Sequence, residues 1–239
     1  MLEEVGELGV LWRYFDAIYC INLERAVQRR EKMSNIFEQY QIPVIFFKAV
    51  EDKNCNRGCL LSHKTIYNQA LQQGFRRILI FEDDLIPTGY VAAEYLQHCI
   101  DYMEKNPWDI FFLGAVPDNF GFRQVRTSTA NIYRIHGICT HAYALSVSGL
   151  EKMKDIHYSP LSPLDYVIKR REDLHCFATY PSMFYQETGY KLPQWMITTG
   201  LRINEFYAYY VGIPLKYMFW VGLGLVVAIV VWKSCRKRS

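Results

Sequence analysis

Short apolar runs alternate with segments of helical periodicity along most of the 239-residue chain. Runs of four to eight apolar residues bounded by polar or turn-forming residues are typical of buried strands. The predicted strands cover 16–23, 44–47, 78–81, 109–114, 132–135, 142–146 and 176–179. The predicted helices cover 33–40, 58–73, 95–102, 148–153 and 163–171. This alternation predicts an α/β domain with a mostly parallel sheet flanked by helices.

An uncharged, apolar run covers 217–232 near the C-terminus, between Lys216 and Lys233. With the two flanking lysines the segment has about 18 residues, which as a helix would extend ~27 Å, close to the thickness of a thin bilayer. Aromatic residues near both ends resemble interfacial anchors. The run is apolar on all faces, which favours a transmembrane helix over the alternative, a buried core helix.

Two signals bear on the membrane orientation, and they disagree. The acidic N-terminus lacks a signal-peptide pattern, which predicts a C-terminal anchor with the α/β domain in the cytosol. The basic tail at 233–239 favours the opposite orientation under the positive-inside rule. Giving the missing signal more weight, we expect a single-pass membrane protein whose main domain is cytosolic.

Charge and cysteine content exclude some partners. The formal net charge is +3, and four basic residues without any acid lie in 233–239, so the rest of the chain is nearly neutral. A near-neutral body without a basic stripe makes nucleic acid a poor candidate partner. The seven cysteines include one close pair, Cys55 and Cys59, with no matching pair elsewhere, so a structural zinc site is not expected.

Three consecutive acids, Glu82, Asp83 and Asp84, follow the predicted strand at 78–81. Ligands of open α/β sheets bind at the carboxyl ends of strands. Carboxylate oxygens there suit Mg²⁺ or Mn²⁺ holding a diphosphate. The cluster predicts a metal-assisted enzyme that uses a nucleotide. The alternative is an acidic turn after a core strand.

Other polar residues fall near predicted strand ends or helix starts: Asn22, Arg25, Arg29, Ser62, His63 and Asp165. Arginines after the first strand could grip a phosphate through charge-assisted hydrogen bonds. Each has a simpler explanation as well. Arg29 could lie on a solvated helix face, His63 could be structural, and Asp165 could cap a helix.

Three segments in order resemble the signature blocks of glycosyltransferase family 25. They are Ile-Asn-Leu-Glu-Arg at 21–25, Gly-Cys-Leu-Leu-Ser-His at 58–63 and Ile-Phe-Glu-Asp-Asp at 80–84. The later segments 140–146 and 163–165 are similar to its downstream blocks. The family includes bacterial lipopolysaccharide β-galactosyltransferases and procollagen galactosyltransferases.

The resemblance implies a GT-A-like, Rossmann-type fold, a UDP-sugar donor and inversion at the anomeric carbon. It implies that Asp84, with Glu82, binds Mn²⁺ or Mg²⁺, and that Asn22 and Arg25 lie against the uridine. The donor-binding set that we expect is Asn22, Arg25, Arg29, Ser62, His63, Glu82 and Asp83. Asp165 is the candidate base for the acceptor hydroxyl, which has a pKa far above 7.

The predicted function is a metal-dependent inverting transfer of a hexose, with galactose first, from a UDP-sugar. The acceptor would be a hydroxyl of a glycan, glycolipid or protein, in lipopolysaccharide or glycoprotein biosynthesis. Two alternatives stay open: a catalytically degenerate protein that binds a sugar nucleotide, and a membrane adaptor. The predicted organisation is an N-terminal extension (1–15), a catalytic domain (16–190), a linker (191–216), a transmembrane helix (217–232) and a basic tail (233–239).

Overall fold

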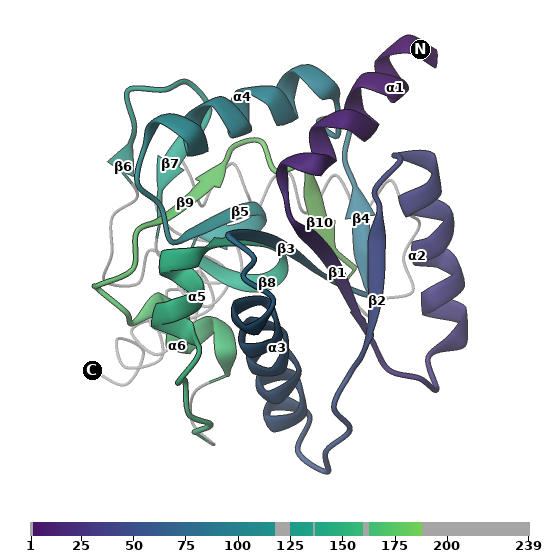
Figure 1. The fold of residues 1–239 in the computed structure, drawn as a ribbon, viewed down its shortest axis with the longest axis vertical. Coiled ribbons are helices and arrows are strands. Elements are labelled where there is room, and N and C mark those ends of the chain that lie inside the picture. The colour runs from purple at the N-terminus through teal and green to yellow at the C-terminus, as the bar shows by residue number, and fades with distance from the viewer. Residues whose placement is uncertain (1, 118–124, 136, 160–162, 188–239) are drawn as a thin grey trace, which may run out of the picture.

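The computed structural model describes residues 2–117, 125–135, 137–159 and 163–187. Their centre is an eight-stranded sheet with the order β2-β1-β3-β8-β5-β9-β7-β6 (Figure 1). Its strands are β1 (Ala17–Asn22), β2 (Val44–Lys48), β3 (Arg77–Glu82), β5 (Ile110–Pro117), β6 (Val125–Arg126), β7 (Ile132–Arg134), β8 (Gly137–Ser146) and β9 (Cys176–Thr179). A separate antiparallel pair joins β4 (Leu85–Pro87) to β10 (Phe184–Gln186).

The sheet is mixed, but most of its strands share one direction. β1 is parallel to both β2 and β3, and β5 is parallel to β9. β8 lies between β3 and β5 and is antiparallel to both. The sheet therefore fits the predicted mostly parallel, Rossmann-type α/β arrangement, with β8 and β7 as exceptions because each is antiparallel to both of its neighbours.

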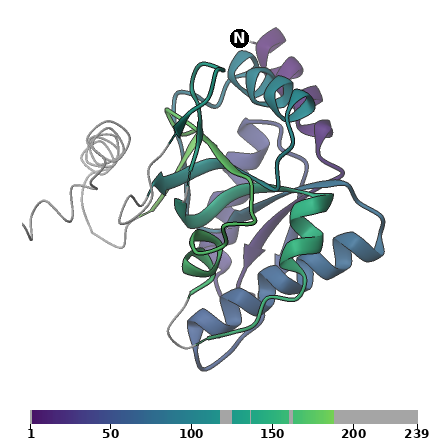
Figure 2. The ribbon, with the colours of Figure 1, turned by 90° about the vertical axis from the view of Figure 1, so that its left-hand side faces the viewer.

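Helices cover both faces of the sheet. They are α1 (Leu2–Leu11), the 3₁₀ helix η1 (Trp12–Tyr14), α2 (Val27–Gln39), α3 (Cys55–Gln72), α4 (Ala93–Lys105), α5 (Val147–Met153) and α6 (Leu164–Lys169). One apolar core lies between the sheet and α1, α2 and α4, and the other lies between the sheet and α3, α5 and α6. Figure 2 shows the sheet nearly edge-on between α1 and α4 on one side and α3 on the other.

Alternation along the strands divides the side chains between these two cores. In β3, Leu79 and Phe81 join the core under α2 and α4, while Ile78 and Ile80 join the core under α3. Successive side chains of a strand point to opposite faces. The next residue, Glu82, is therefore directed toward α3, on the side of Ile80.

The N-terminal residues pack on the domain. Trp12 is fully buried, and its indole Nε1 donates a hydrogen bond to the carbonyl oxygen of Tyr40 at 3.1 Å. Leu8 and Phe15 join the same core. Most of the segment predicted as an extension is thus tied to the α2 face of the sheet.

The predicted transmembrane helix requires a correction. Within the described ranges no helix is both long and apolar enough to cross a bilayer. The longest of them, α3, has 18 residues, but it carries Arg57, His63 and Lys64. Residues 217–232 lie outside the described residues. The fold class of the described residues is therefore an α/β sheet with flanking helices, and none of those helices could span a bilayer. The predicted membrane location with a cytosolic domain depended on that helix and is corrected with it.

Candidate active site

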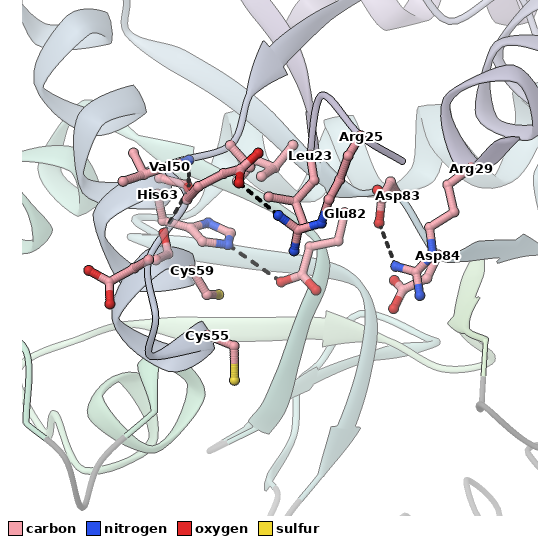
Figure 3. Close-up of a pocket in the computed structure, with 16 residues that line it drawn as sticks. Leu23, Arg25, Arg29, Val50, Cys55, Cys59, His63, Glu82, Asp83 and Asp84 are labelled. Atoms are coloured by element: carbon pink, nitrogen blue, oxygen red, sulfur yellow. Dashed lines mark hydrogen bonds and ion pairs between the residues drawn. The ribbon is translucent and has the colours of Figure 1, made fainter. Parts of the chain in front are cut away.

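The candidate site lies at the carboxyl ends of β1 and β3. The two strands are adjacent and parallel, with Ile21 opposite Glu82, so the polar residues after each strand meet at one edge. A cavity of about 270 Å³ opens there. All three acids line it, together with residues from the segment after β1, the segment after β2 and α3 (Figure 3).

Asp83 is held by groups from β1 and α2. Asn22 is buried, and its Nδ2 donates to Asp83 Oδ2 at 2.7 Å. Arg29 Nη1 donates to Asp83 Oδ1 at 2.9 Å. Both carboxylate oxygens are therefore engaged within the protein, and Asp83 fixes the ends of the two strands relative to α2. Asn22 Oδ1 is buried and has no hydrogen-bond partner.

Glu82 faces the opposite side and meets α3 and β8. Its Oε1 accepts a hydrogen bond from Thr140 Oγ1 at 2.9 Å and lies 3.4 Å from His63 Nε2. Burial alone would raise the pKa of this carboxyl. The imidazole of His63, whose Nε2 lies 3.4 Å away, and the hydrogen bond from Thr140 outweigh burial and hold the pKa of Glu82 below its usual range. Glu82 is therefore an ionised carboxylate at neutral pH.

Asp84 has the least satisfied carboxylate of the three. Its Oδ2 accepts a hydrogen bond from Gln186 Nε2 at 3.1 Å, whereas Oδ1 is buried without a hydrogen-bond partner. Burial, and then the negative charge of Glu82, raise the pKa of Asp84 to about 6. A buried, unpartnered carboxylate oxygen beside other carboxylates is chemically suited to a hard divalent cation. The residues present thus fit a Mg²⁺ or Mn²⁺ ion, with Asp84 as the first ligand and Glu82 as its neighbour.

The family model for "Glycosyltransferase family 25 (LPS biosynthesis protein)" matches residues 15–57 and 54–168. This match covers more than half of the chain and includes the whole acid cluster. The chain belongs to glycosyltransferase family 25. The family resemblance of the signature segments is thereby confirmed.

Curated relatives are distant and longer than this family 25 chain. A glycosyltransferase 25 family member of Drosophila pseudoobscura pseudoobscura is 25% identical over 77% of the chain and 36% of its own length. Procollagen galactosyltransferase 1 of Danio rerio is 24% identical over 72% of the chain and 34% of its own length. A probable inactive glycosyltransferase 25 family member 3 of Bos taurus is 24% identical over 72% and 34%. The chain spans about a third of the length of these relatives.

Among solved structures, A197 from STIV aligns with 72% of the family 25 chain and 85% of its own chain, with 10% identity. The TM-score of 0.48 is too low to establish a common fold.

Two of the residues predicted for this site, Arg25 and Ser62, have local roles in the fold. Arg25 Nη1 donates to Glu51 Oε2 at 2.8 Å in an exposed pair at the cavity. Ser62 is buried, where its Oγ accepts from the backbone N–H of Val50 and donates to the carbonyl of Gly58, each at 2.8 Å. Ser62 thus ties α3 to the segment after β2.

Asp165 is separated from the acid cluster. It lies in the first turn of α6, where Oδ1 accepts from the backbone N–H of Tyr166 at 2.9 Å and Oδ2 from that of Cys139 at 3.5 Å. Asp165 is not among the described residues that line the cavity. Partial burial, with the charges of Glu82 and Asp165, raises the pKa of the Cys59 thiol to about 12. Asp165 thus affects the electrostatic environment of Cys59 without lining the cavity.

Some site residues escaped the sequence reasoning. Thr140 and Tyr143 lie in a segment of β8 that resembled the family, but nothing in the pattern assigned them a partner. Gln186 reaches Asp84 because β10 pairs with β4, directly after the acids. Cys59 belongs to the cysteine pair and to the block at 58–63, but neither pattern predicts a role for its thiol at the site. No local signal marks these contacts, since each depends on two elements that are distant in the chain.

Proposed function

We propose that the protein is a metal-dependent, inverting glycosyltransferase that moves a hexose from a UDP-sugar to a hydroxyl group of a glycan, glycolipid or protein. Family membership supports glycosyl transfer. Galactose is the first donor sugar to test, because relatives of this chain carry the name procollagen galactosyltransferase.

The observation that carries this proposal is the unsatisfied carboxylate of Asp84 at the cavity. Its buried Oδ1 lacks a hydrogen-bond partner, and its pKa is raised by burial and by the charge of Glu82. Without a cation, the unpaired oxygen and the unfavourable charge of the buried carboxylate both destabilise the folded protein. A divalent cation bound to Asp84 would remove both effects. A bound Mg²⁺ or Mn²⁺ ion would act as a Lewis acid on the oxygens of a departing diphosphate.

In this proposal Arg29, Asn22 and Arg25 bind and orient the UDP-sugar. Arg29 spends one N–H group on Asp83, and a guanidinium has five, so it retains donors for a phosphate oxygen. Asn22 Oδ1 is a buried acceptor without a partner, and it can accept a hydrogen bond from an N–H group of the uracil ring. Arg25, at the cavity, completes the positive side of this donor site.

We propose Asp165 as the base that removes the proton from the acceptor hydroxyl. Its two carboxylate oxygens each accept one backbone N–H group, which leaves lone pairs for a further hydrogen bond from the acceptor hydroxyl. A positioned base contributes about 10²–10⁴-fold to a rate. Asp165→Asn should therefore lower turnover by about that factor and leave UDP affinity unchanged. Equal losses in UDP affinity and turnover would instead give Asp165 a structural role.

The test of the function uses the full chain, freed of metal by a chelator. UDP is titrated calorimetrically with Mn²⁺, with Mg²⁺ and without metal, and the protein is then screened with UDP-sugars for donor hydrolysis. We expect metal-enhanced UDP binding and hydrolysis of one or a few UDP-hexoses. Unchanged UDP affinity on adding metal would overturn the metal-dependent mechanism.

A second candidate function is sugar-nucleotide binding without turnover. Two relatives at 24% identity, from Bos taurus and Mus musculus, are named as inactive or probably inactive members of the family. The same experiment separates the two functions. Metal-enhanced UDP binding without hydrolysis or transfer for any UDP-sugar would favour the binding protein.

A further inference from the structure

We infer that Cys59, His63 and Glu82 form a second metal site, for a thiolate-preferring divalent ion such as Zn²⁺, on the α3 side of the acid cluster. One ligand atom from each residue lies within 4.8 Å of the other two. The set combines a sulfur, an imidazole nitrogen and one carboxylate oxygen, which zinc accepts and Mg²⁺ does not favour. The inference does not depend on the proposed transferase activity.

The strongest sign of a ligand is the imidazole of His63. Its side chain is buried, and Nδ1 lies 2.8 Å from the hydroxyl of Tyr143. The other ring nitrogen, Nε2, is buried without a hydrogen-bond partner and is directed at Glu82 (Figure 3). When Nδ1 carries the proton and donates to Tyr143, the Nε2 lone pair faces a carboxylate oxygen. That arrangement is repulsive unless a cation or a proton lies between them.

A second layer of hydrogen bonds orients two of the three ligands, His63 and Glu82. The hydroxyl of Tyr143 contacts that of Tyr67 as well as His63, so it can accept from the imidazole and donate to Tyr67. Thr140 Oγ1 donates to Glu82 Oε1 at 2.9 Å. Hydrogen bonds of this kind fix the tautomer of a metal-binding histidine and raise the basicity of the ligands. The pair is therefore built with its ligand atoms already directed at one point.

Cys59 supplies the third ligand from the same helix. It precedes His63 by four residues, which places both side chains on one face of α3. The thiol is free and lines the cavity. Ligand atoms around a tetrahedral zinc ion lie roughly 3–4 Å apart, so the three ligand atoms, which lie within 4.8 Å of one another, would have to approach one another further when an ion binds. Metal binding releases the thiol proton of Cys59 and any proton held on His63 Nε2.

Three protein ligands leave a fourth position that faces the cavity. Structural zinc sites are closed by four protein ligands, whereas sites with three keep one position for water or another ligand. The lack of a second cysteine pair to match Cys55 and Cys59 argues only against the closed type. The α3 side of the cavity would thus hold an ion that is accessible from the cavity.

The experiment uses the untagged full chain, stripped of metal and titrated with Co²⁺, a spectroscopic substitute for Zn²⁺. We expect one equivalent to bind with a thiolate-to-cobalt charge-transfer band in the near ultraviolet, and Zn²⁺ to displace it. Cys59→Ser should remove the band and weaken Co²⁺ binding at least about tenfold. Cys55→Ser, at a second thiol of the same helix that lines the cavity, is the matched control and should keep the band.

Three results would overturn the site: no thiolate band in the wild-type protein, a band that survives in Cys59→Ser, or a band that disappears in Cys55→Ser. Glu82→Gln should also weaken Co²⁺ binding, whereas Asp84→Asn should leave the band intact. The behaviour of Asp84→Asn separates this site from the proposed donor metal. If Asp84→Asn loses UDP binding but keeps the cobalt band, the Cys59 site is supported independently of the transferase proposal.

Discussion

Glu82 and Asp84 are two residues apart in the sequence, yet their carboxylates have opposite environments, and their pKa values are shifted in opposite directions. On the α3 side, His63 and Thr140 stabilise the carboxylate of Glu82, and its pKa is lowered. On the side of β10, Gln186 contacts one oxygen of Asp84, the other oxygen has no partner, and the pKa is raised to about 6.

The difference separates two kinds of ionic site within one cavity. The carboxylate of Glu82 has the imidazole of His63 and the hydroxyl of Thr140 beside it, whereas one oxygen of Asp84 has no partner within the described residues. A cation from solution should bind most favourably at the carboxylate whose oxygen has no partner within the protein. Five predictions test this contrast, in order of decreasing effect.

The largest effect is expected from Asp84→Asn on metal-dependent UDP binding. The substitution keeps the shape of the side chain but removes the charge that would hold the cation. We expect the gain in UDP affinity caused by Mn²⁺ to fall at least about 100-fold, or ~2.7 kcal/mol. Calorimetry measures it, with Asp101→Asn as the control, because Asp101 is an exposed acid on α4 that contacts Gln97. A variant that kept the full Mn²⁺ effect would assign the cation to another acid.

The buried network on the α3 side should matter chiefly for stability. Tyr143→Phe removes the hydroxyl that contacts both His63 and Tyr67 and leaves two buried polar groups without this partner. Such a loss costs about 1–3 kcal/mol. Urea unfolding measures the change in free energy. Tyr90→Phe is the control at an exposed tyrosine and should change stability very little. Similar stabilities for the two variants would argue against a network that depends on Tyr143.

The pH dependence of stability should distinguish the two acids in the metal-free protein. The pKa of Asp84 is about 6 in the folded state against 3.8 for an ordinary aspartate, so the carboxyl favours folding only while it is protonated. Its contribution is present below about pH 4 and is lost as the pH rises through about 6. Asp84→Asn should therefore match the wild type at low pH and exceed its stability at pH 7 by roughly 1–2 kcal/mol.

Glu82→Gln should behave in the opposite way. The folded-state pKa of Glu82 is lowered, so its contribution is present above the unfolded pKa and is lost as the pH falls. The variant should be less stable than the wild type at pH 7, and the gap should close toward acid pH. Thermal unfolding in chelator across this pH range measures both variants. Parallel curves for the two would contradict the opposite environments of the two acids.

The smallest effect is expected from Arg29→Gln on stability. The ion pair with Asp83 involves a guanidinium that is 59% exposed. Exposed pairs contribute about 0–1 kcal/mol and weaken with salt. We expect a loss of that size in urea unfolding at low salt, and less at high salt. A loss of several kcal/mol would mean that Asp83 depends on Arg29 more than on Asn22.

Much of the fold was predictable from local patterns. The apolar run at 78–81 lies within β3, and the runs at 16–23 and 109–114 correspond to β1 and β5. The helix α1 and the strands β4 and β10 were missed. β4 and β10 have three residues each, and their hydrogen bonds come from pairing with each other, so neither has a strong signal in isolation.

The site was predictable in its location but not in its contacts. The acid cluster at the end of β3, and Asn22 at the end of β1, follow from the rule that parallel strands present their carboxyl ends at one edge. Asp165 was expected near the reacting groups; the structure places it in the first turn of α6, and it is not among the residues that line the cavity. The contact between Gln186 and Asp84 joins residues 102 positions apart.

The amino-acid sequence by itself determined where the strands lie, which of their side chains point to each face, and that acids follow the central strand. These properties are local, because backbone geometry alternates side chains over a few residues. Only the tertiary structure decided that Glu82 meets His63 and Cys59 while Asp84 keeps an oxygen without a partner. Those contacts depend on how α3, β8 and β10 pack around the end of β3, and packing between distant elements is a property of the whole chain.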